Sequence, residues 1–175
     1  MIGKDIHEFA KKLWPINRSI TGNGVRETLL EIKNHLPDLE IKSISSGSKA
    51  FDWKVPKEWI VTEAYILTPS GERICDFAEN NLHLLGYSIP FEGEVSLDEL
   101  KQHLHTLPDQ PNAIPYITSY YEERWGFCLS QEQFDQLEDG TYSIHIDSKL
   151  FEGVLNYGEL LIGGKSSKEV FISTY

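Results

Sequence analysis

The chain has 175 residues, of which 40% are hydrophobic and 25% charged, close to the averages of soluble globular proteins, so a disordered or fibrous chain is excluded. Its formal net charge is −11, and residues 61–175 carry nineteen Asp and Glu against six Lys and Arg. Such an acidic surface repels phosphate backbones, so this part should not bind nucleic acid, and an amine-bearing ligand is electrostatically easier.

Apolar runs are short throughout the sequence. None reaches the roughly 18 to 20 residues that a membrane helix needs, so no membrane association is expected. Residues 1–8 alternate charged and apolar side chains and lack the apolar core of a secretory signal, which predicts a cytoplasmic protein. Cys75 and Cys128 are too few and too far apart for a disulfide scaffold or a metal knuckle, so both should be buried free thiols.

Two amphipathic helices are predicted near the N-terminus. Residues 4–13 place apolar side chains at helical spacing up to Pro15, and residues 25–36 do so up to Pro37. Between them, Gly22, Asn23 and Gly24 are flanked by Arg18 and Arg26. This loop fits an anion site at a helix start, and it fits ordinary turn and cap chemistry equally well.

The pattern becomes β-like from residue 39. Strands are predicted over 39–44 and 59–67, and the turn residues 69–72 join the second of these to 74–77 as a hairpin. Residues 82–89 are predicted to extend the sheet. The aromatic residues Phe51, Trp53 and Trp59 are interpreted as core or interface residues rather than as a sugar-stacking surface.

Residues 96–99 (Ser-Leu-Asp-Glu) form a capping box that should open a helix reaching at least residue 104. A Pro-rich connector over 107–115 follows, and residues 131–137 favour a short helix. Further strands are predicted at 117, 125–129, 142–146, 154–162 and 170–172. The apolar run 170–174 should pair beside residues 39–44. It would be buried on both faces in a complete α/β core, but this chain lacks the helices that would cover it, so its apolar surface should be exposed and prone to associate.

His103 and His105 form an HxH pair, which suits a metal only if both rings lie on the same side of a strand. If the predicted helix continues through them, the rings lie about 200° apart around its axis. We therefore expect no metal site here and only weak zinc binding by this chain.

One segment mixes side chains suited to recognition. Residues 120–128 combine aromatic, acidic and arginine side chains, which suit a substrate amine or a sugar face, although a strand with a buried aromatic face explains them too. A Cys128 nucleophile has no supporting feature. Together with residues just upstream, where Tyr116 also lies, the candidate substrate-binding residues are Asp109, Tyr120, Tyr121, Arg124 and Trp125.

Several long motifs resemble, in the same order, bacterial aminopeptidase-like proteins associated with polysaccharide biosynthesis. They are WPINRSITGNGVR (14–26), FDWKVPKEW (51–59), HLHTLPDQP (103–111), residues 117–130 and YGELLI (157–162). The resemblance implies the front part of an α/β/α zinc-exopeptidase-like core with an inserted β-rich domain, an α+β fold in the part present. It divides the chain into N-terminal helices and a first core strand (1–60), the insertion (61–162) and a return strand (163–175).

In the relatives, the metal ligands follow the segment that resembles residues 172–175, so no catalytic or metal residue is expected in this chain. The resemblance implies a fragment of a zinc aminopeptidase that is inactive alone. Its partners would be a peptide or a small amine-bearing substrate and the remainder of the peptidase domain, with zinc bound only in the full-length relative. A non-catalytic module that binds a peptide or a saccharide stays open as the alternative.

Overall fold

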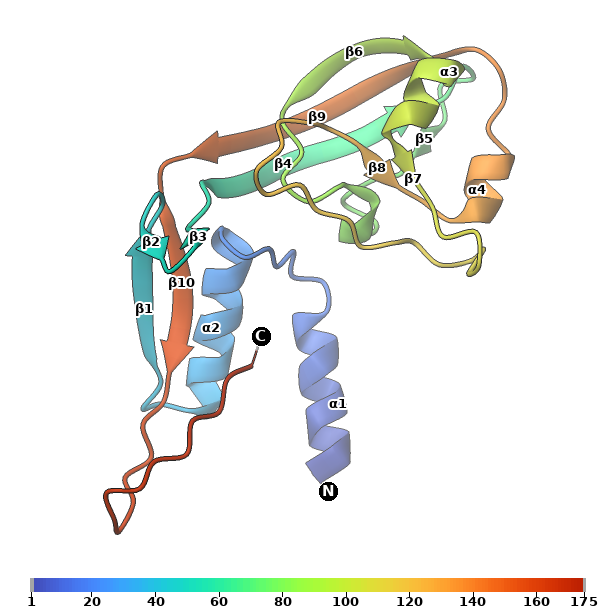
Figure 1. The fold of residues 1–175 in the computed structure, drawn as a ribbon. Helices are drawn as coiled ribbons and strands as arrows, with labels where there is room; N and C mark the ends of the chain where they lie inside the picture. The colour runs from blue at the N-terminus through green and yellow to red at the C-terminus, as the bar shows by residue number, and fades with distance from the viewer. Residues whose placement is uncertain (1, 175) are drawn as a thin grey trace.

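The computed structural model describes residues 2–174. A four-stranded sheet lies above a stem, which consists of two helices and a two-stranded ribbon (residues 2–45 and 154–159; Figure 1). Within this range, ten strands form four sheets. The helices are α1 (Ile2–Leu13), α2 (Asn23–His35), α3 (Leu97–Leu100) and α4 (Gln131–Asp135), with 3-10 turns η1 (Asn81–His83) and η2 (Lys101–His103). The strands are β1 (Glu40–Ser45), β2 (Lys49–Ala50), β3 (Trp53–Lys54), β4 (Glu58–Leu67), β5 (Arg73–Ile74), β6 (Phe91–Ser96), β7 (Leu104–His105), β8 (Phe127–Cys128), β9 (Thr141–Phe151) and β10 (Val154–Glu159).

The main sheet has the strand order β5-β4-β9-β6 and is antiparallel. β4 and β9 pair from Glu58 opposite Phe151 to Leu67 opposite Ser143. Alternate side chains of these strands, such as Ile66 and Ile144, are buried on one face. The predicted strands 59–67 and 142–146 and the hairpin that follows β4 are confirmed, because their alternating pattern matches a sheet with one covered face.

Irregular chain covers the buried face of this sheet and corrects one prediction. Residues 82–89 were predicted as a strand, but they form η1 and a buried loop in which Tyr87 has a φ of 67°. The backbone of this loop bonds to two separate segments, with Leu85 N donating to Gly126 O and Gly86 N to Ile117 O. The run is apolar because it is buried. It forms a loop rather than a strand because its backbone groups bond to two segments far along the chain instead of to one neighbouring strand.

β6 is a strand that the sequence reading missed. Its residues Phe91, Gly93 and Val95 alternate with Glu92 and Glu94. Glycine and glutamate are both poor strand formers, which hid the alternation. Pairing with β9 along its whole length, from Phe91 opposite Ile146 to Ser96 opposite Thr141, overrides that local preference.

The predicted helix after Ser96 is shorter than expected. Ser96 Oγ accepts a hydrogen bond from Glu99 N at 3.3 Å and caps α3, but the helix ends at Leu100. Leu104 and His105 then form β7, which pairs in parallel with β8. The placement of both histidines on one helix was therefore wrong, because pairing with a distant strand outcompetes continuation of the helix.

Three predicted helices are confirmed. α1 and α2 match the two amphipathic segments, and α4 begins with a capping box between Ser130 and Gln133. α1 nevertheless buries no residue and meets α2 through the ion pair Lys12–Glu31 and the ring contact Phe9–His35. None of the described helices is long and apolar enough to cross a bilayer.

β1 and β10 form an antiparallel ribbon, from Glu40 opposite Glu159 to Ser45 opposite Val154. β1 precedes the four-stranded sheet along the chain and β10 follows it, so the ribbon brings the entry and the exit of that sheet side by side (Figure 1). The predicted strand at 39–44 is confirmed. The division at residues 61 and 162 stays a prediction.

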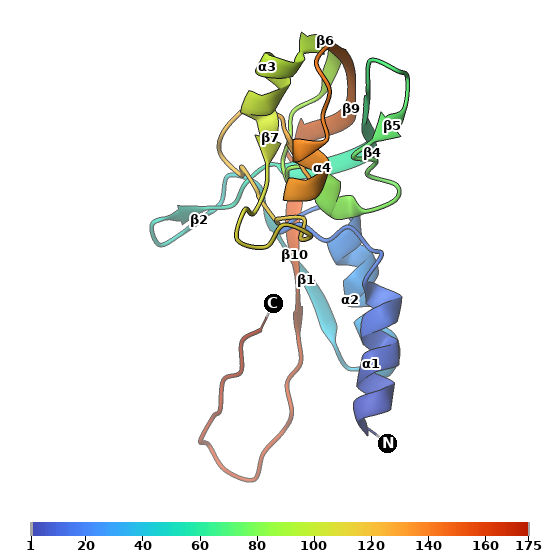
Figure 2. The ribbon, with the colours of Figure 1, turned by 90° about the vertical axis from the view of Figure 1, so that its right-hand side faces the viewer.

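The segment after β10 differs from expectation. Residues 160–174 contain no strand, and Val170, Phe171 and Ile172 are 89%, 90% and 83% exposed. The predicted pairing of 170–174 beside residues 39–44 was wrong, since β1 pairs with β10 alone in the described chain, whereas the expected exposure of the apolar side chains is seen. Figure 2 shows that this segment extends away from α1.

Candidate functional site

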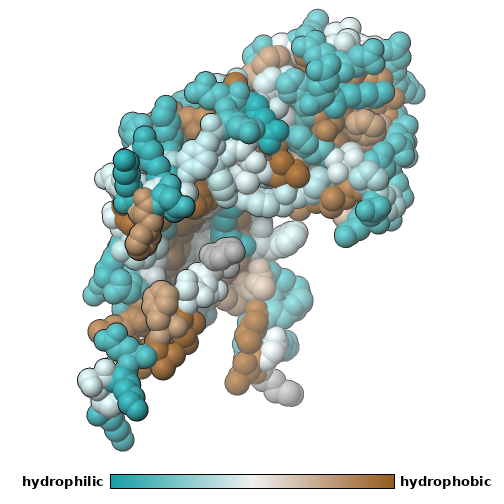
Figure 3. All heavy atoms as spheres, viewed as in Figure 1, coloured by the Kyte–Doolittle hydropathy of each residue, from teal (hydrophilic) through white to brown (hydrophobic). Residues whose placement is uncertain are grey.

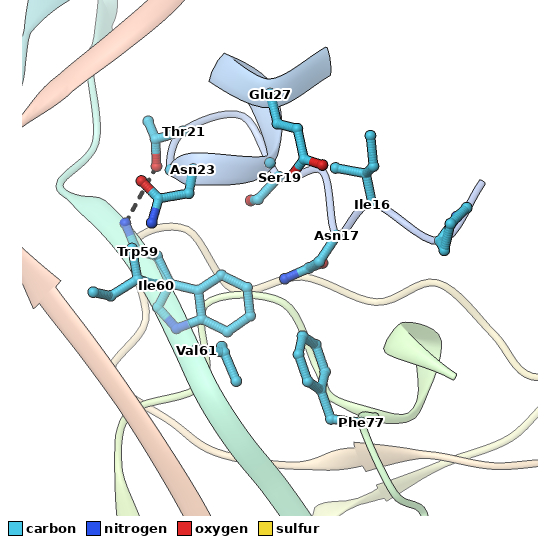
Figure 4. A pocket seen from close by; sticks show the side chains of 13 residues that line it. Ile16, Asn17, Ser19, Thr21, Asn23, Glu27, Trp59, Ile60, Val61 and Phe77 are labelled. Atoms are coloured by element: carbon cyan, nitrogen blue, oxygen red, sulfur yellow. Dashed lines mark hydrogen bonds between the residues drawn. The ribbon is translucent and has the colours of Figure 1, made fainter. Parts of the chain in front are cut away.

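The loop between α1 and α2 crosses β4 and encloses a hollow of about 360 Å³ (Figure 4). Side chains from the loop and α2 lie along one side, and those of β4 and Phe77 lie along the other. The lining residues are Pro15, Ile16, Asn17, Ser19, Thr21, Gly22, Asn23, Gly24, Glu27, Trp59, Ile60, Val61 and Phe77. The site thus combines a carboxylate, hydroxyls and amides with an apolar floor.

Buried hydrogen bonds fix this loop against the sheet. Thr21 Oγ1 and Tyr87 Oη share a hydrogen bond of 2.5 Å, and Trp59 N donates to Thr21 Oγ1 at 3.3 Å. Trp59 Nε1 and Ser148 Oγ both donate to Ser88 O, at 2.9 and 2.7 Å. Burial raises the pKa of Tyr87 to about 12, so its hydroxyl stays neutral and available for this network.

The glycines of the loop are required for its close packing. Gly22 has a φ of 98°, and a Cβ there would lie 2.5 Å from Trp59 O. A Cβ on Gly24 would lie 1.8 Å from Asn17 O. Asn23 Oδ1 accepts a hydrogen bond from Arg26 Nη2. These contacts support the turn interpretation, because the glycines face the chain's own backbone rather than a free anion.

Arg26 and Glu58 join three elements beside the hollow. Glu58 is 3% exposed, and its carboxylate accepts hydrogen bonds from Arg26 Nη2 at 2.5 Å and from Val154 N at 3.1 Å. Burial raises the pKa of Glu58. The two hydrogen bonds and the positive charge of Arg26 together lower it by more than burial raises it, so the net pKa lies below the ordinary value. The pair connects α2, β4 and β10. The Arg26 guanidinium is therefore used in structural hydrogen bonds.

A second hollow of about 170 Å³ lies next to the first. Both are lined by Ile16, Asn17, Ser19 and Trp59. The second adds Trp14, Arg18, Asn81, Leu82, Leu84, Gly86 and Tyr116. Trp14 and Tyr116 are 71% and 62% exposed, so the smaller hollow has aromatic side chains open to solvent.

The five predicted substrate-binding residues do not gather in either hollow. Trp125 is 7% exposed and stacks with the rings of Phe91 and His103, with ring centroids 4.4 and 3.7 Å apart. This packing corresponds to the alternative interpretation, a buried aromatic residue. Tyr120 is half-buried against Tyr87.

The other three candidates lie nearer the surface. Tyr121 is exposed and donates to Lys54 O at 2.6 Å, and Arg124 Nε lies 3.2 Å from a Glu122 carboxylate oxygen. Asp109 is exposed in the connector before Tyr116. Substrate binding by the five stays a prediction.

Sequence reasoning missed Asn17, Ser19 and Glu27 as lining residues. The available signal was the polar composition of the motif 14–26 between two helices. The sequence placed Arg18 beside a possible anion-binding loop and Tyr116 beside the aromatic segment, and the structure places both around the smaller hollow. What the sequence lacked was the position of β4 opposite the loop.

The histidines of the HxH pair serve packing. His103 Nδ1 lies 3.1 Å from Trp125 O, and its ring stacks on the indole of that residue. Burial, then the positive charges of Arg124 and His103, lower the pKa of His105, which favours its neutral form. Nowhere between residues 2 and 174 do three His, Cys, Asp or Glu side chains gather in a way that could hold a metal ion.

Comparison with known proteins gives the class first. Residues 58–149 match the family described as "Domain of unknown function (DUF2172)", and the chain belongs to this family. A protein of Clostridium acetobutylicum named "Putative polysaccharide biosynthesis protein with aminopeptidase-like domain" is 50% identical over 173 residues, which cover 99% of this chain and 40% of that protein. The resemblance to part of an aminopeptidase-like protein is confirmed.

A solved structure supports the same conclusion. The crystal structure of a "putative peptidase" from Clostridium acetobutylicum superimposes with a TM-score of 0.86 at 52% sequence identity. The match covers 90% of this chain and 37% of that one. The mixed α/β fold is therefore shared with a protein described as a peptidase, and the chain spans about 40% of the curated relative's length.

Proposed function

We propose that this chain is the substrate-facing part of an aminopeptidase-like zinc hydrolase, a cytoplasmic enzyme that removes N-terminal residues from peptides or cleaves a related amide. The observation that carries the proposal is the 50% identity, along 99% of the chain, to a protein named for its aminopeptidase-like domain. The hollow between loop 14–22 and β4 supports it, because a carboxylate and amides above an apolar floor suit the free end of a peptide.

Zinc would be held by the part of the relatives that this chain does not span. The residues described here do not fit a zinc centre, because they bring no three metal ligands together. We therefore assign no catalytic step to them. Their proposed role is to bind and orient a substrate whose amine is favoured by the acidic surface of residues 61–175.

The proposal includes an inserted β-rich unit at 61–162 and a peptidase domain that packs against the stem. Support comes from the β1–β10 ribbon, which places the entry and exit of the upper sheet side by side. Apolar surface gathers over the lower half of the molecule (Figure 3). It includes Ile2 and Ile6 of α1, 79% and 63% exposed, and the apolar residues 170–172.

The test is aminopeptidase activity of the full-length gene product that contains this chain. We expect release of p-nitroaniline from leucine p-nitroanilide, loss of that activity with 1,10-phenanthroline, and recovery on addition of zinc. The 175-residue chain assayed alone should release none. Absence of activity toward a panel of aminoacyl p-nitroanilides in the zinc-loaded full-length protein would contradict the proposal.

A second candidate, saccharide binding, rests on the β2–β3 hairpin, which projects sideways from the body in Figure 2. Phe51 at its tip has a φ of 57° and is fully exposed, and Trp53 is 36% exposed. Neither lies in the core of the described residues, so of the core-or-interface interpretation only an interface role stays a prediction for them, whereas Trp59 is in the core at 4%. Exposed aromatic rings suit sugar faces, so Trp53→Ala should weaken binding to a glycan array if this function holds.

A further inference from the structure

The two hollows beside loop 14–22 share one wall. Ile16, Asn17, Ser19 and Trp59 line both, so the two hollows adjoin at these residues. Asn17 and Ser19 supply side-chain donors and acceptors along this shared stretch. The indole of Trp59, which is held by its bond to Ser88 O, supplies a rigid apolar wall.

Each hollow adds one charged residue that lacks an ionic partner, and the two charges are opposite. Glu27 lines the larger hollow and Arg18 the smaller one. Within residues 2–174, neither forms an ion pair. Arg18 Nη1 donates a hydrogen bond to Leu13 O at 2.8 Å. This bond orients the guanidinium and leaves its other N–H donors free.

Two ion pairs lie close to these two residues along the chain. Arg26 bonds to Glu58, and Lys12 lies 2.5 Å from Glu31. In Figure 4 the Glu27 side chain reaches toward Ser19 and Ile16, across the hollow from Val61 and Phe77. The two adjoining hollows, together called the groove, therefore present an exposed carboxylate at one and an exposed guanidinium at the other.

We infer that this groove binds a short unblocked peptide by both of its ends, with the α-amine at Glu27 and the α-carboxylate at Arg18. The inference rests on the proposed function and names its substrate class. Asn17 and Ser19 would bond the peptide backbone between the two ends. Trp14 and Tyr116, both exposed beside Arg18, would contact an apolar C-terminal side chain. A neutral sugar would use neither free charge.

Calorimetric titration of the full 175-residue chain tests the inference. The probes are alanyl-phenylalanine, its N-acetyl derivative and its C-terminal amide. We expect each blocked peptide to bind about tenfold more weakly than the free dipeptide, because each loses one charge-assisted hydrogen bond. Equal binding of free and blocked peptides, or no binding of the dipeptide, would overturn the inference.

Two substitutions assign the ends. Glu27→Gln should remove the sensitivity to acetylation and keep the sensitivity to amidation, and Arg18→Gln should do the reverse. Because Arg18→Gln also removes the bond to Leu13 O, Arg18→Lys serves as a second variant that restores the charge and should recover the preference for a free carboxylate. Matched controls are Glu72→Gln and Lys149→Gln, which change exposed charges outside both hollows and should bind as the parent does.

Glucuronic acid is the competing probe. If it binds more tightly than the dipeptide and Arg18→Gln abolishes its binding, the groove is a site for an acidic sugar and the inference fails. Failure here is distinct from failure of the proposed function, since the full-length protein would still release p-nitroaniline if the peptide ends were held elsewhere. Conversely, dipeptide binding without hydrolysis by the full-length protein would retain the groove and reject the enzyme.

Discussion

Glu58 illustrates how much a single buried carboxylate holds together in this fold. Replacing it by Gln removes the charge that faces the Arg26 guanidinium, whose side chain is 34% exposed, and places a neutral amide at the buried Glu58 position. We expect Glu58→Gln to lower the free energy of unfolding by about 2 to 4 kcal/mol. Urea denaturation measures this change in the free energy of unfolding. The control is Glu72→Gln at an exposed position, which should change stability by less than about 0.5 kcal/mol.

The same residue predicts a pH dependence. The folded pKa of Glu58 lies below its unfolded value, so its stabilising contribution is complete above the unfolded pKa of about 4.3 and is lost as the pH falls through the folded pKa. The difference in stability between the parent chain and Glu58→Gln should therefore shrink as the pH is lowered from 5 to 3. A difference that stays constant over this range would show that the Glu58 charge is not involved.

The thiols should be unreactive in the folded chain. Burial raises the pKa of Cys75 to about 12, with a further contribution from Cys128, and burial raises the pKa of Cys128 to about 11. Both are buried free cysteines, as the sequence predicted. At pH 8, Ellman's reagent should label neither thiol rapidly, and both should react at once in 6 M guanidinium chloride. Rapid labelling of the native chain would contradict the structure around them.

The element that shapes the candidate site is the turn into α2. Gly24 faces Asn17 O so closely that any Cβ requires the backbone to shift. Gly24→Ala should therefore lower the free energy of unfolding by at least about 2 kcal/mol and displace the loop that lines both hollows. Thermal denaturation checks this, and Gly163→Ala, where no atom lies within 4 Å of an added Cβ, should leave stability nearly unchanged.

α1 is a weakly anchored helix, because all of its residues except Phe9 and Leu13 are exposed. It buries no residue, whereas β4 and β9 contain fully buried side chains such as Ala64 and Ile66 of β4. Short helices without a packed face open readily, so α1 amides should exchange with solvent orders of magnitude faster than those of β4 and β9. Hydrogen exchange followed by mass spectrometry gives the comparison. Equal protection of α1 and β9 would mean that α1 is held by contacts that the structure lacks.

At the scale of the whole molecule, the exposed apolar segment at 170–172 predicts self-association. A double substitution, Val170→Glu with Phe171→Glu, should lower the fraction of dimers and larger species by removing apolar surface. The matched control, Ser166→Glu with Ser167→Glu, adds the same charge without removing apolar side chains. Sedimentation velocity separates the two: equal association of both variants and the parent would show that this segment does not drive it.

Local patterns in the sequence determined the elements whose structure depends on near neighbours. The periodicity of α1, α2, β4 and β9, the caps at Ser96 and Ser130 and the β4–β5 turn were predictable, because helical faces, alternating strands and capping side chains involve residues a few positions apart. Long motifs likewise determined the relationship to aminopeptidase-like proteins. The acidic character of residues 61–175 was also readable directly.

Only the tertiary structure decided where those elements meet. The buried loop at 84–89, the β7–β8 pairing and the β1–β10 ribbon depend on partners many residues away, which no local pattern encodes. The candidate site shows the same division: the motif 14–26 was visible, but its hollows exist because Thr21 bonds to Tyr87 and Trp59 from other parts of the chain. Hydrogen-bond partners distant in sequence place this loop over β4, and the three-dimensional fold alone specifies them.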